Sequence, residues 1–365
     1  MVKMRSRFLL ALLLFALLTI APAVLGFGPP SVVDSSSEVG ASYPFVASQI
    51  AAAQRATPPA IGARASIVID TATGRQLAGG HERDRLPIAS TTKIMTALLA
   101  IERGRLDQVV TASVTAADLP GSSVMGLRSG ERLTLEDLLY GMMLPSGNDA
   151  ALTVARAIAG SDTAFVALMN RRAAELGLAD THFANPHGLD APDHYSSATD
   201  LASLARVALA NPTFARIVAT RQKTVVGLAS KASYDLTNTN PLLARTDAEG
   251  IKTGHTDAAG ACLVGAFLRD GHRIITVVLN SPDYTADSVA LADYAYSASV
   301  WQIIESPASP FDRAPGATRP RFRDSSTIVL PAWQVPYLSV EVLPAGDTVR
   351  VSVAGRERAV FTLAN

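Results

Sequence analysis

Compact apolar runs bounded by turn residues occur in two parts of the chain and predict strands there. The strands predicted near the beginning are 65–70 and 75–78, on either side of a Thr73-Gly74 turn, and those near the other end are 251–253, 261–268 and 273–279.

Between and after these runs, apolar residues recur at helical spacing. The predicted helices are 90–104, most of 133–177 with loops at 145–147 and near 160, then 200–209 and 286–304. Strands at both ends with helices between them predict an α+β fold, in which an antiparallel sheet is flanked by helices and carries a helical insert.

The first 26 residues have the pattern of a secretory signal. Lysine or arginine occupies positions 3, 5 and 7, residues 8–21 are apolar apart from Thr19, and small residues follow at 21–23. The same stretch also approaches the length of an uncleaved membrane anchor. Under both interpretations we expect the remaining chain to be extracytoplasmic, with any membrane tether at the N-terminus.

The composition along the chain predicts two linkers and a small second domain. Pro, Ser and Ala dominate before the first strand, with one short helix expected at 44–55, and Pro and Arg are in excess after 306. Short strands are predicted at 327–330, 337–343, 348–353 and 359–363. The predicted divisions are a signal or anchor at 1–26, a linker at 27–60, the main domain at 61–305, a second linker at 306–325 and a small β domain at 326–365.

Charge and cysteine content exclude several classes of function. The 365 residues carry 32 Lys and Arg against 32 Asp and Glu, a formal net charge of zero, so no nucleic-acid partner is expected. Cys262 is the single cysteine, which excludes an internal disulfide and a cysteine-rich metal site. We interpret it as a small buried apolar residue, and we expect neither a metal nor a cofactor.

Ser90 and Lys93 form the first group with catalytic potential. Three residues apart, they lie on one face of the predicted helix. A serine hydroxyl is a weak nucleophile until a base takes its proton. A lysine becomes such a base when its pKa falls, and both burial and the positive end of a helix lower it. Alone, the pair is more often a capping serine and a surface lysine.

Two further groups complete the set. Ser146 and Asn148 lie in the loop between two predicted helices, where a hydroxyl and an amide are suited to relay a proton and to orient a lysine or a substrate carbonyl. Lys252 and Thr253 lie on a predicted strand, suited to hold a carboxylate, and Gly254 allows close approach to the backbone. Each group alone is uninformative, but penicillin-binding proteins and class A β-lactamases share this trio in this order.

Longer stretches resemble the D-alanyl-D-alanine carboxypeptidases of peptidase family S11. The matching stretches are 87–96 (PIASTTKIMT), 145–151 (PSGNDAA), 181–183, 187–190, 195–197 and 250–256 (GIKTGHT). The resemblance covers about residues 65–293 and implies the serine β-lactamase/transpeptidase fold. It implies peptidoglycan stem peptides as substrates and β-lactam antibiotics as inhibitors.

The resemblance also assigns roles to the motif residues. It implies Ser90 as nucleophile, Lys93 as base, and Ser146 with Asn148 for proton relay and positioning. It implies Lys252, Thr253 and Gly254 for the substrate carboxylate, and the backbone N–H groups of Ser90 and His255 as the oxyanion hole.

One departure concerns the substrate carboxylate. Relatives usually hold it with an additional Arg after the strand that follows the Lys-Thr-Gly strand, but no Arg occurs here between Leu279 and Arg313. We therefore expect weak capture of short peptides unless Arg269 or Arg273 substitutes.

Alternative functions are open at this point. His182, His187, Asp190 and His194 suggest a zinc peptidase, but without an H-E-x-x-H helix we interpret them as hydrogen-bonding residues. A β-lactamase needs a deacylating base, and no Glu before Lys252 stands in an E-x-x-L-N setting. A non-enzymatic penicillin-sensing or wall-binding protein is less favoured because all three motifs are intact.

Overall fold

The computed structural model describes residues 56–304, 321–322, 326–343 and 348–364. The predicted signal or anchor, the helix predicted at 44–55 and most of both predicted linkers lie outside these residues. The described residues form the predicted α+β architecture, although the predicted domain boundaries remain a prediction.

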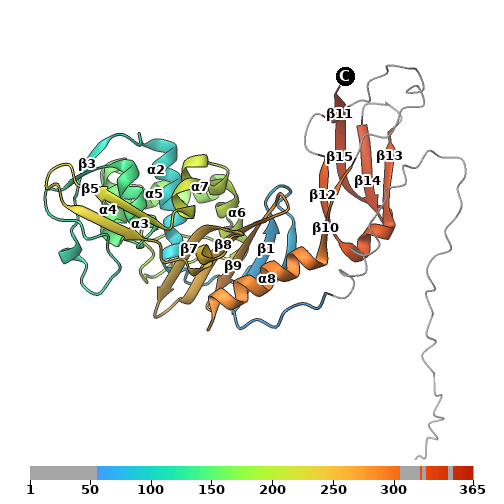
Figure 1. The fold of residues 1–365 in the computed structure, drawn as a ribbon, viewed down its shortest axis with the longest axis horizontal. Coiled ribbons are helices and arrows are strands. Elements are labelled where there is room, and N and C mark those ends of the chain that lie inside the picture. Colours follow the sequence, from blue (N-terminus) through green and yellow to red (C-terminus); the bar gives the residue numbers. More distant parts are fainter. Residues whose placement is uncertain (1–55, 305–320, 323–325, 344–347, 365) are drawn as a thin grey trace, which may run out of the picture. The chain divides into compact units, whose positions relative to one another are not determined.

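A five-stranded antiparallel sheet is the centre of the fold of residues 56–298 (Figure 1). Across the sheet the strands are β2 (Gln76–Gly80), β1 (Ala65–Asp70), β9 (His272–Leu279), β8 (Gly260–Arg269) and β7 (Ala248–Thr256). The strands predicted from the apolar runs are confirmed. The order places β7 at one edge, so the motif residues 252–255 lie on a strand with one open side.

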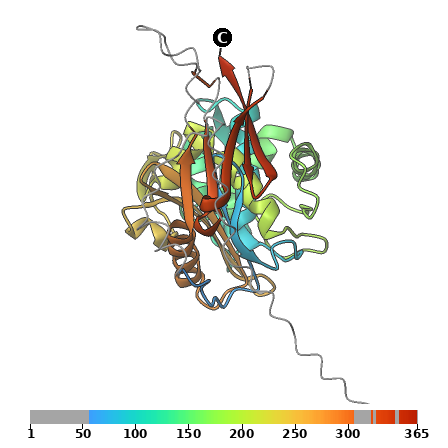
Figure 2. The same cartoon turned by 90° about the vertical axis from the view of Figure 1, so that its right-hand side faces the viewer.

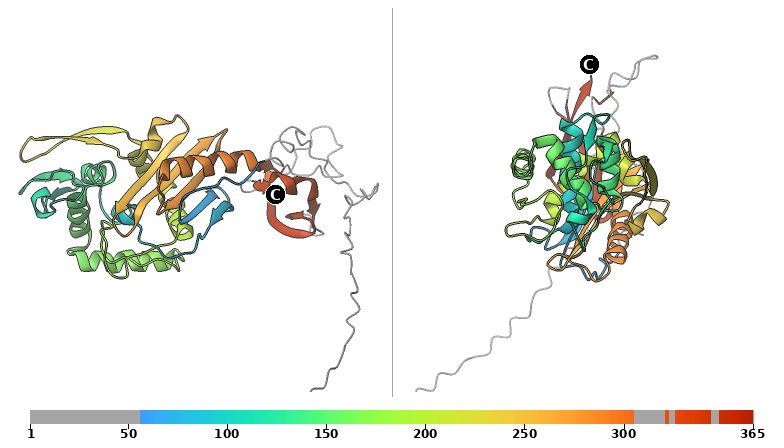
Figure 3. Two further views of the ribbon diagram at one scale, coloured as in Figure 1. Left: turned by 90° about the horizontal axis from the view of Figure 1, so that it is seen from below. Right: turned by 90° about the vertical axis from the view of Figure 1, so that its left-hand side faces the viewer.

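Both faces of this sheet are covered, which explains the long apolar runs of β1, β8 and β9. On one face, Val68, Phe267 and Val278 pack against Leu291 and Ala295 of α8 (Tyr284–Ala298). Neighbouring strand residues point to the other face and join the larger core beneath the remaining helices. Figure 3 shows α8 crossing one face of the sheet.

The helical insert is built around one buried helix. The helices are α2 (Lys93–Arg103), α3 (Leu135–Met143), α4 (Asn148–Ala159), α5 (Asp162–Glu175), α6 (Ala198–Leu209) and α7 (Pro212–Ala219). Every residue of α2 from Lys93 to Ala100 is buried, so other elements surround this helix on all sides. Thr134 and Ser197 cap the N-termini of α3 and α6 through their side chains. No single helix among the described residues is long and apolar enough to span a bilayer.

Two short hairpins in the insert were not predicted. They are β3 (Val109–Thr111) with β4 (Arg132–Thr134), and β5 (Gln222–Val226) with β6 (Ser233–Thr237). The buried carboxylate of Glu131 joins them by accepting hydrogen bonds from Ser230 Oγ and Tyr234 Oη. β3 and β4 are only three residues long and β5 is mostly exposed, whereas β6 (SYDLT) alternates exposed and buried residues and carried a signal that the sequence analysis overlooked.

The prediction of one helix over 286–304 is wrong beyond Ala298. Residues Ser299–Ile303 form β10, which pairs with β12 (Thr327–Pro331). The aromatic and β-branched side chains in this segment favour a strand, and Trp301 also donates a hydrogen bond of 2.9 Å to Asp70. These contacts are made by residues far away in sequence, so they are invisible to a periodicity argument.

The remaining C-terminal strands form an antiparallel sheet of their own, shown in red in Figure 2. Its order is β11 (Arg321–Phe322), β15 (Arg356–Ala364), β14 (Thr348–Val353) and β13 (Leu338–Val342). Alternate residues Val349, Val351 and Val353 of β14 are buried, and Val351 and Val353 belong to a small core. The predicted strands of the small β domain are therefore confirmed, while its relation to the rest of the chain remains a prediction.

Candidate active site

Ser90 lies in a short 3-10 turn, η1 (Ala89–Thr92), that leads directly into α2. Lys93 is the first residue of α2, and its Nζ lies 2.8 Å from Ser90 Oγ. Ser90 is half-buried, whereas Lys93 is completely buried. The two residues therefore face each other as their spacing predicted.

The partners of Lys93 fit a neutral amine. Besides Ser90 Oγ, its Nζ contacts Asn148 Oδ1 and the His187 carbonyl oxygen, each at 2.7 Å. Both carbonyl oxygens only accept hydrogen bonds, so they take the two hydrogens of a neutral amine. In the neutral form the remaining lone pair faces the Ser90 hydroxyl, whereas in the charged form Nζ donates a third hydrogen bond to Ser90 Oγ. Burial holds the pKa of Lys93 well below its usual range, and the neighbouring Lys252 lowers it further, against an opposing effect of Asp149.

The structure brings Asn148 into this group but does not join Ser146 to it by a hydrogen bond. Asn148 begins α4 and is buried. Ser146 is 6% exposed and has a φ of +64°. Within the described residues its hydroxyl has no hydrogen-bond partner, so its relay role stays a prediction.

The edge strand β7 brings the third motif to the nucleophile. A Cβ placed on Gly254 would lie 2.9 Å from the Ser90 backbone nitrogen, so only glycine allows this approach. Lys252 is buried and donates to the Thr253 carbonyl oxygen at 2.9 Å. Burial lowers the pKa of Lys252 to about 7. His255 is exposed on the same strand, and its part in an oxyanion hole stays a prediction.

Thr239 is a site residue that the sequence analysis missed. Its Oγ1 lies 2.8 Å from Thr253 Oγ1, and Thr239 is exposed. It follows β6 in an otherwise ordinary polar loop, so no sequence signal distinguishes it. Two hydroxyl groups therefore stand side by side at Thr253, the residue that follows Lys252 on β7.

No arginine substitutes for the missing one among the cations considered. Arg269 pairs with Asp247 and Asp293, and Arg273 pairs with Glu249. Both guanidinium groups are therefore occupied within the fold. Asp287, near the place where relatives would carry the arginine, instead accepts hydrogen bonds from the Gly62 backbone and from Ser281.

Asp149, directly after Asn148, anchors a loop against the site. Its buried carboxylate accepts backbone hydrogen bonds from Met125 at 2.8 Å, Gly126 at 3.0 Å and Leu127 at 2.9 Å. It also accepts one from its neighbour Ala150 at 2.9 Å. In addition, the Asn148 backbone N–H donates to the Ser123 carbonyl oxygen at 2.8 Å. One carboxylate thus ties the 123–127 segment to the start of α4.

The loop of residues 181–196 connects the other parts of the site. Its His187 carbonyl contacts Lys93, and its His194 Nε2 lies 2.7 Å from Thr92 Oγ1. Asp190 accepts a hydrogen bond of 2.6 Å from Thr256, at the end of β7. We expected hydrogen-bonding roles for the histidines here, and the structure shows them. The loop bridges the nucleophile and the edge strand.

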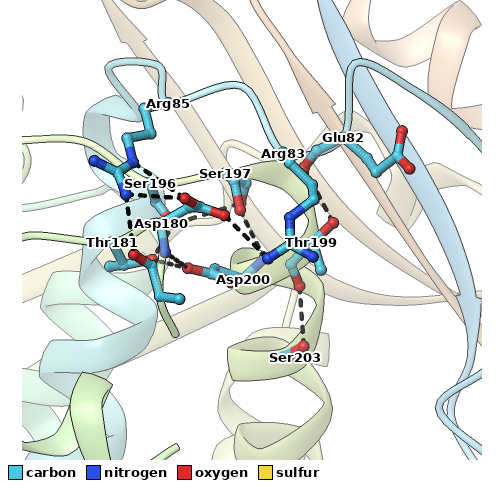
Figure 4. A network of polar contacts seen from close by, with 11 residues as sticks. Glu82, Arg83, Arg85, Asp180, Thr181, Ser196, Ser197, Thr199, Asp200 and Ser203 are labelled. Atoms are coloured by element: carbon cyan, nitrogen blue, oxygen red, sulfur yellow. Dashed lines mark hydrogen bonds and ion pairs between the residues drawn. The ribbon is translucent and has the colours of Figure 1, made fainter. Parts of the chain in front are cut away.

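A polar network fixes both ends of this loop (Figure 4). Asp200 accepts hydrogen bonds from the Asp180 backbone and from Thr181 Oγ1, each at 2.7 Å. Thr181 Oγ1 lies 2.7 Å from Ser196 Oγ, and Arg85 pairs with Asp180. The start of the loop is therefore held by the buried carboxylate of Asp200 at the N-terminus of α6, and Ser196 joins the end of the loop to its start. Among the described residues, no cluster of His, Cys, Asp and Glu is arranged to hold a metal ion.

The fold of the described residues is similar to that of penicillin-binding proteins and DD-transpeptidases. Penicillin binding protein 6B from Escherichia coli has a similar structure, with a TM-score of 0.71 and 29% identity over 85% of this chain and 97% of that one. The Streptomyces K15 DD-transpeptidase gives a TM-score of 0.63 and 32% identity over 66% of this chain and 99% of that one.

A family model described as D-alanyl-D-alanine carboxypeptidase matches residues 52–283, so the chain belongs to this family, peptidase S11. The D-alanyl-D-alanine carboxypeptidase DacD of Salmonella typhimurium is 39% identical over 237 residues, which are 61% of this chain and 59% of the relative. The aligned part thus spans about three fifths of that relative's length.

Proposed function

We propose that this protein is a serine-type D-Ala-D-Ala carboxypeptidase that removes the terminal D-Ala of peptidoglycan stem peptides through an acyl-enzyme on Ser90. The observation that carries the proposal is the surrounding of Lys93 Nζ, which fits a neutral base 2.8 Å from Ser90 Oγ. The family membership and the penicillin-binding fold support it. Its extracytoplasmic location rests on the signal-like residues 1–26.

The geometry supports a two-step reaction. Lys93 takes the proton of the Ser90 hydroxyl as Oγ attacks the carbonyl carbon of the penultimate D-Ala. The backbone N–H groups of Ser90 and His255 stabilise the negative charge on the carbonyl oxygen. The C–N bond then breaks, the leaving D-Ala nitrogen receives the proton with Ser146 as relay, and an ester remains on Ser90. Water hydrolyses this ester and regenerates the hydroxyl.

We assign the terminal carboxylate of the substrate to Lys252 and Thr253, with Gly254 leaving room for the peptide. β-Lactam antibiotics would acylate the same Ser90. The β-lactamase alternative remains the second candidate, on the same fold, but it has no specific observation in its favour. A non-enzymatic penicillin sensor would not require the fully assembled Lys93 environment.

Covalent labelling of Ser90 tests the proposed function directly. We expect benzylpenicillin to raise the intact mass of the protein by one drug adduct, and Ser90→Ala to give none, because the acyl bond forms on Oγ. Peptide mapping should place the adduct on the peptide that contains Ser90. An adduct on the Ala variant would contradict the assignment, and wild-type protein that forms none would favour a non-catalytic function.

Recognition of a free carboxylate gives a second test. A charge-assisted hydrogen bond contributes about 1.5–3 kcal/mol, so we expect kcat/KM for a peptide ending in D-Ala-D-Ala to exceed that of its C-terminal amide by at least ~10-fold. Lysine is charged below its pKa, and that of Lys252 is about 7. The acid-to-amide ratio should therefore fall as pH rises through this value.

Titration of Lys93 changes the rates for the acid and for the amide by the same factor, so it cancels in their ratio. Lys252→Gln should abolish the preference, whereas Lys223→Gln, which removes an exposed cation of β5, should preserve it. Equal rates for the acid and the amide with the wild-type protein would show that no carboxylate is recognised.

A further inference from the structure

The peptide that joins Ala89 to Ser90 is held in an unfavourable conformation. Ala89 has a φ of +48°, in the left-handed region, and this costs a residue other than glycine about 1–3 kcal/mol. Ala89 is buried, and its carbonyl oxygen accepts a hydrogen bond of 2.8 Å from Thr92 Oγ1. The surrounding contacts must keep this peptide in place.

His194 supplies the next link through a defined tautomer. The Ala184 backbone N–H donates to His194 Nδ1 at 2.9 Å, so this nitrogen carries no hydrogen. The hydrogen is then on Nε2, which donates to Thr92 Oγ1 at 2.7 Å. The hydroxyl of Thr92 in turn donates a hydrogen bond to the Ala89 carbonyl oxygen. Burial lowers the pKa of His194 to about 4, so the ring is neutral near pH 7 and keeps this tautomer.

This chain of hydrogen bonds ends on the same peptide unit that carries the Ser90 N–H. Because a peptide is planar, holding the Ala89 carbonyl oxygen also fixes the direction of the Ser90 N–H. Two glycines confine the peptide further. A Cβ on Gly188 would lie 2.0 Å from the Ala89 oxygen, and one on Gly254 would lie 2.9 Å from the Ser90 nitrogen.

We propose that His194 is a positioning residue for acylation, which acts through Thr92 to aim the Ser90 N–H at the developing oxyanion. This inference rests on the proposed acyl-enzyme function and deepens it. His194 touches neither the substrate nor the reacting atoms. Its effect should therefore appear in the stabilisation of the transition state and not in ground-state binding.

Two substitutions of His194 separate its two hydrogen bonds. In His194→Asn, the amide oxygen takes the position of Nδ1 and still accepts the hydrogen bond from the Ala184 N–H. No atom then takes the position of Nε2, so the hydrogen bond to Thr92 is lost. The longer Gln places an amide N–H near Nε2. Because removal of an oxyanion-hole donor costs about 10²–10³ in rate, we expect misdirection of one donor by His194→Asn to slow acylation by a fluorescent penicillin at least ~10-fold. His194→Gln should keep at least about a third of the rate.

The affinity for a transition-state analogue distinguishes positioning of the Ser90 N–H from a merely structural role, which would leave this affinity unchanged. An N-acylated aminoethylboronic acid forms a tetrahedral adduct on the serine, so its affinity should fall in parallel with the acylation rate across the variants. The KM for a D-Ala-D-Ala peptide should change less than ~3-fold. His182→Asn is the control, since His182 is an exposed histidine of the same loop whose side chain hydrogen-bonds only to the Asp193 carbonyl oxygen among the described residues.

Substitutions at Thr92 test the same chain if His194→Asn fails to fold. Thr92→Val removes the linking hydroxyl and should match the loss seen for His194→Asn, whereas Thr92→Ser should retain most of the rate. The double variant Thr92→Val/His194→Asn should be no more than ~3-fold slower than either single variant, because both break one chain.

Three results would overturn the inference while the proposed function stands. They are equal rates for the Gln and Asn variants, multiplied losses in the double variant, and unchanged boronate affinity, each measured on protein whose wild type forms the Ser90 adduct. Absence of the wild-type adduct would instead overturn the proposed function, and the inference with it.

Discussion

Replacing Lys93 by Arg should lower the rate of acylation by at least ~100-fold, the usual scale for loss of a general base. The substitution keeps a positive charge but removes the ability to give up a proton near neutral pH. In the wild-type protein Lys93 is completely buried, and its Nζ donates hydrogen bonds to two carbonyl oxygens, those of the Asn148 side chain and the His187 backbone. An arginine at this place has no lone pair to direct at Ser90 Oγ.

The pH profile adds an independent measurement. A lysine is a base above its pKa, and burial holds the pKa of Lys93 well below the usual range. The wild-type acylation rate should therefore rise with pH to a plateau that begins far below pH 10. Thermal unfolding of the Arg variant should be recorded in parallel to exclude collapse of the site. Near-normal acylation by a folded Arg variant would refute the base role.

Asp149→Ala should produce the largest loss of stability, about 3–5 kcal/mol, the range for breaking a buried charged network. Its carboxylate satisfies four backbone N–H groups, three of them in the 125–127 segment. Their desolvation would no longer be compensated. For a domain of this size the unfolding midpoint should drop by roughly 10 °C, and acylation should fall because Asn148 loses its support.

Asp118→Ala is the matched control for Asp149→Ala. Asp118 also accepts two hydrogen bonds in the same loop, from the backbone and side chain of Thr115, but it is exposed. Water can replace its carboxylate, so this variant should lose about 1 kcal/mol or less. Similar losses for the two variants would show that the anchoring by Asp149 does not matter. Chemical denaturation with the same probe for both provides the comparison.

Local sequence was sufficient for the parts of the site that lie within one element. The Ser90–Lys93 pair depends only on helical spacing, and residues 252 and 253 lie within one short predicted strand. The order of the three motifs then indicated that they meet. The structure places Lys93 beside Asn148 and Gly254 beside Ser90, as that order required.

The residues that were missed are those whose partners are distant in sequence. Asp149 looks like an ordinary acidic residue at the start of a helix, because its partners lie 22–24 residues earlier in a loop without periodicity. His194 contacts Thr92 across 102 positions, and Thr239 contacts Thr253 through a hydroxyl pair. Single-sequence patterns report neighbours along an element and contain no information on such contacts. The misassigned end of the 286–304 helix has the same cause.

Cys262 pairs in register with Gly254, so the only thiol of the chain lies one strand behind the nucleophile. It is completely buried, and burial raises its pKa to about 11. A reagent that modifies thiols reaches it only when the core packed around it opens, and the folded protein offers almost no thiolate. The rate at which Cys262 is modified therefore measures how often the structure behind the active site opens, and no engineered label is needed.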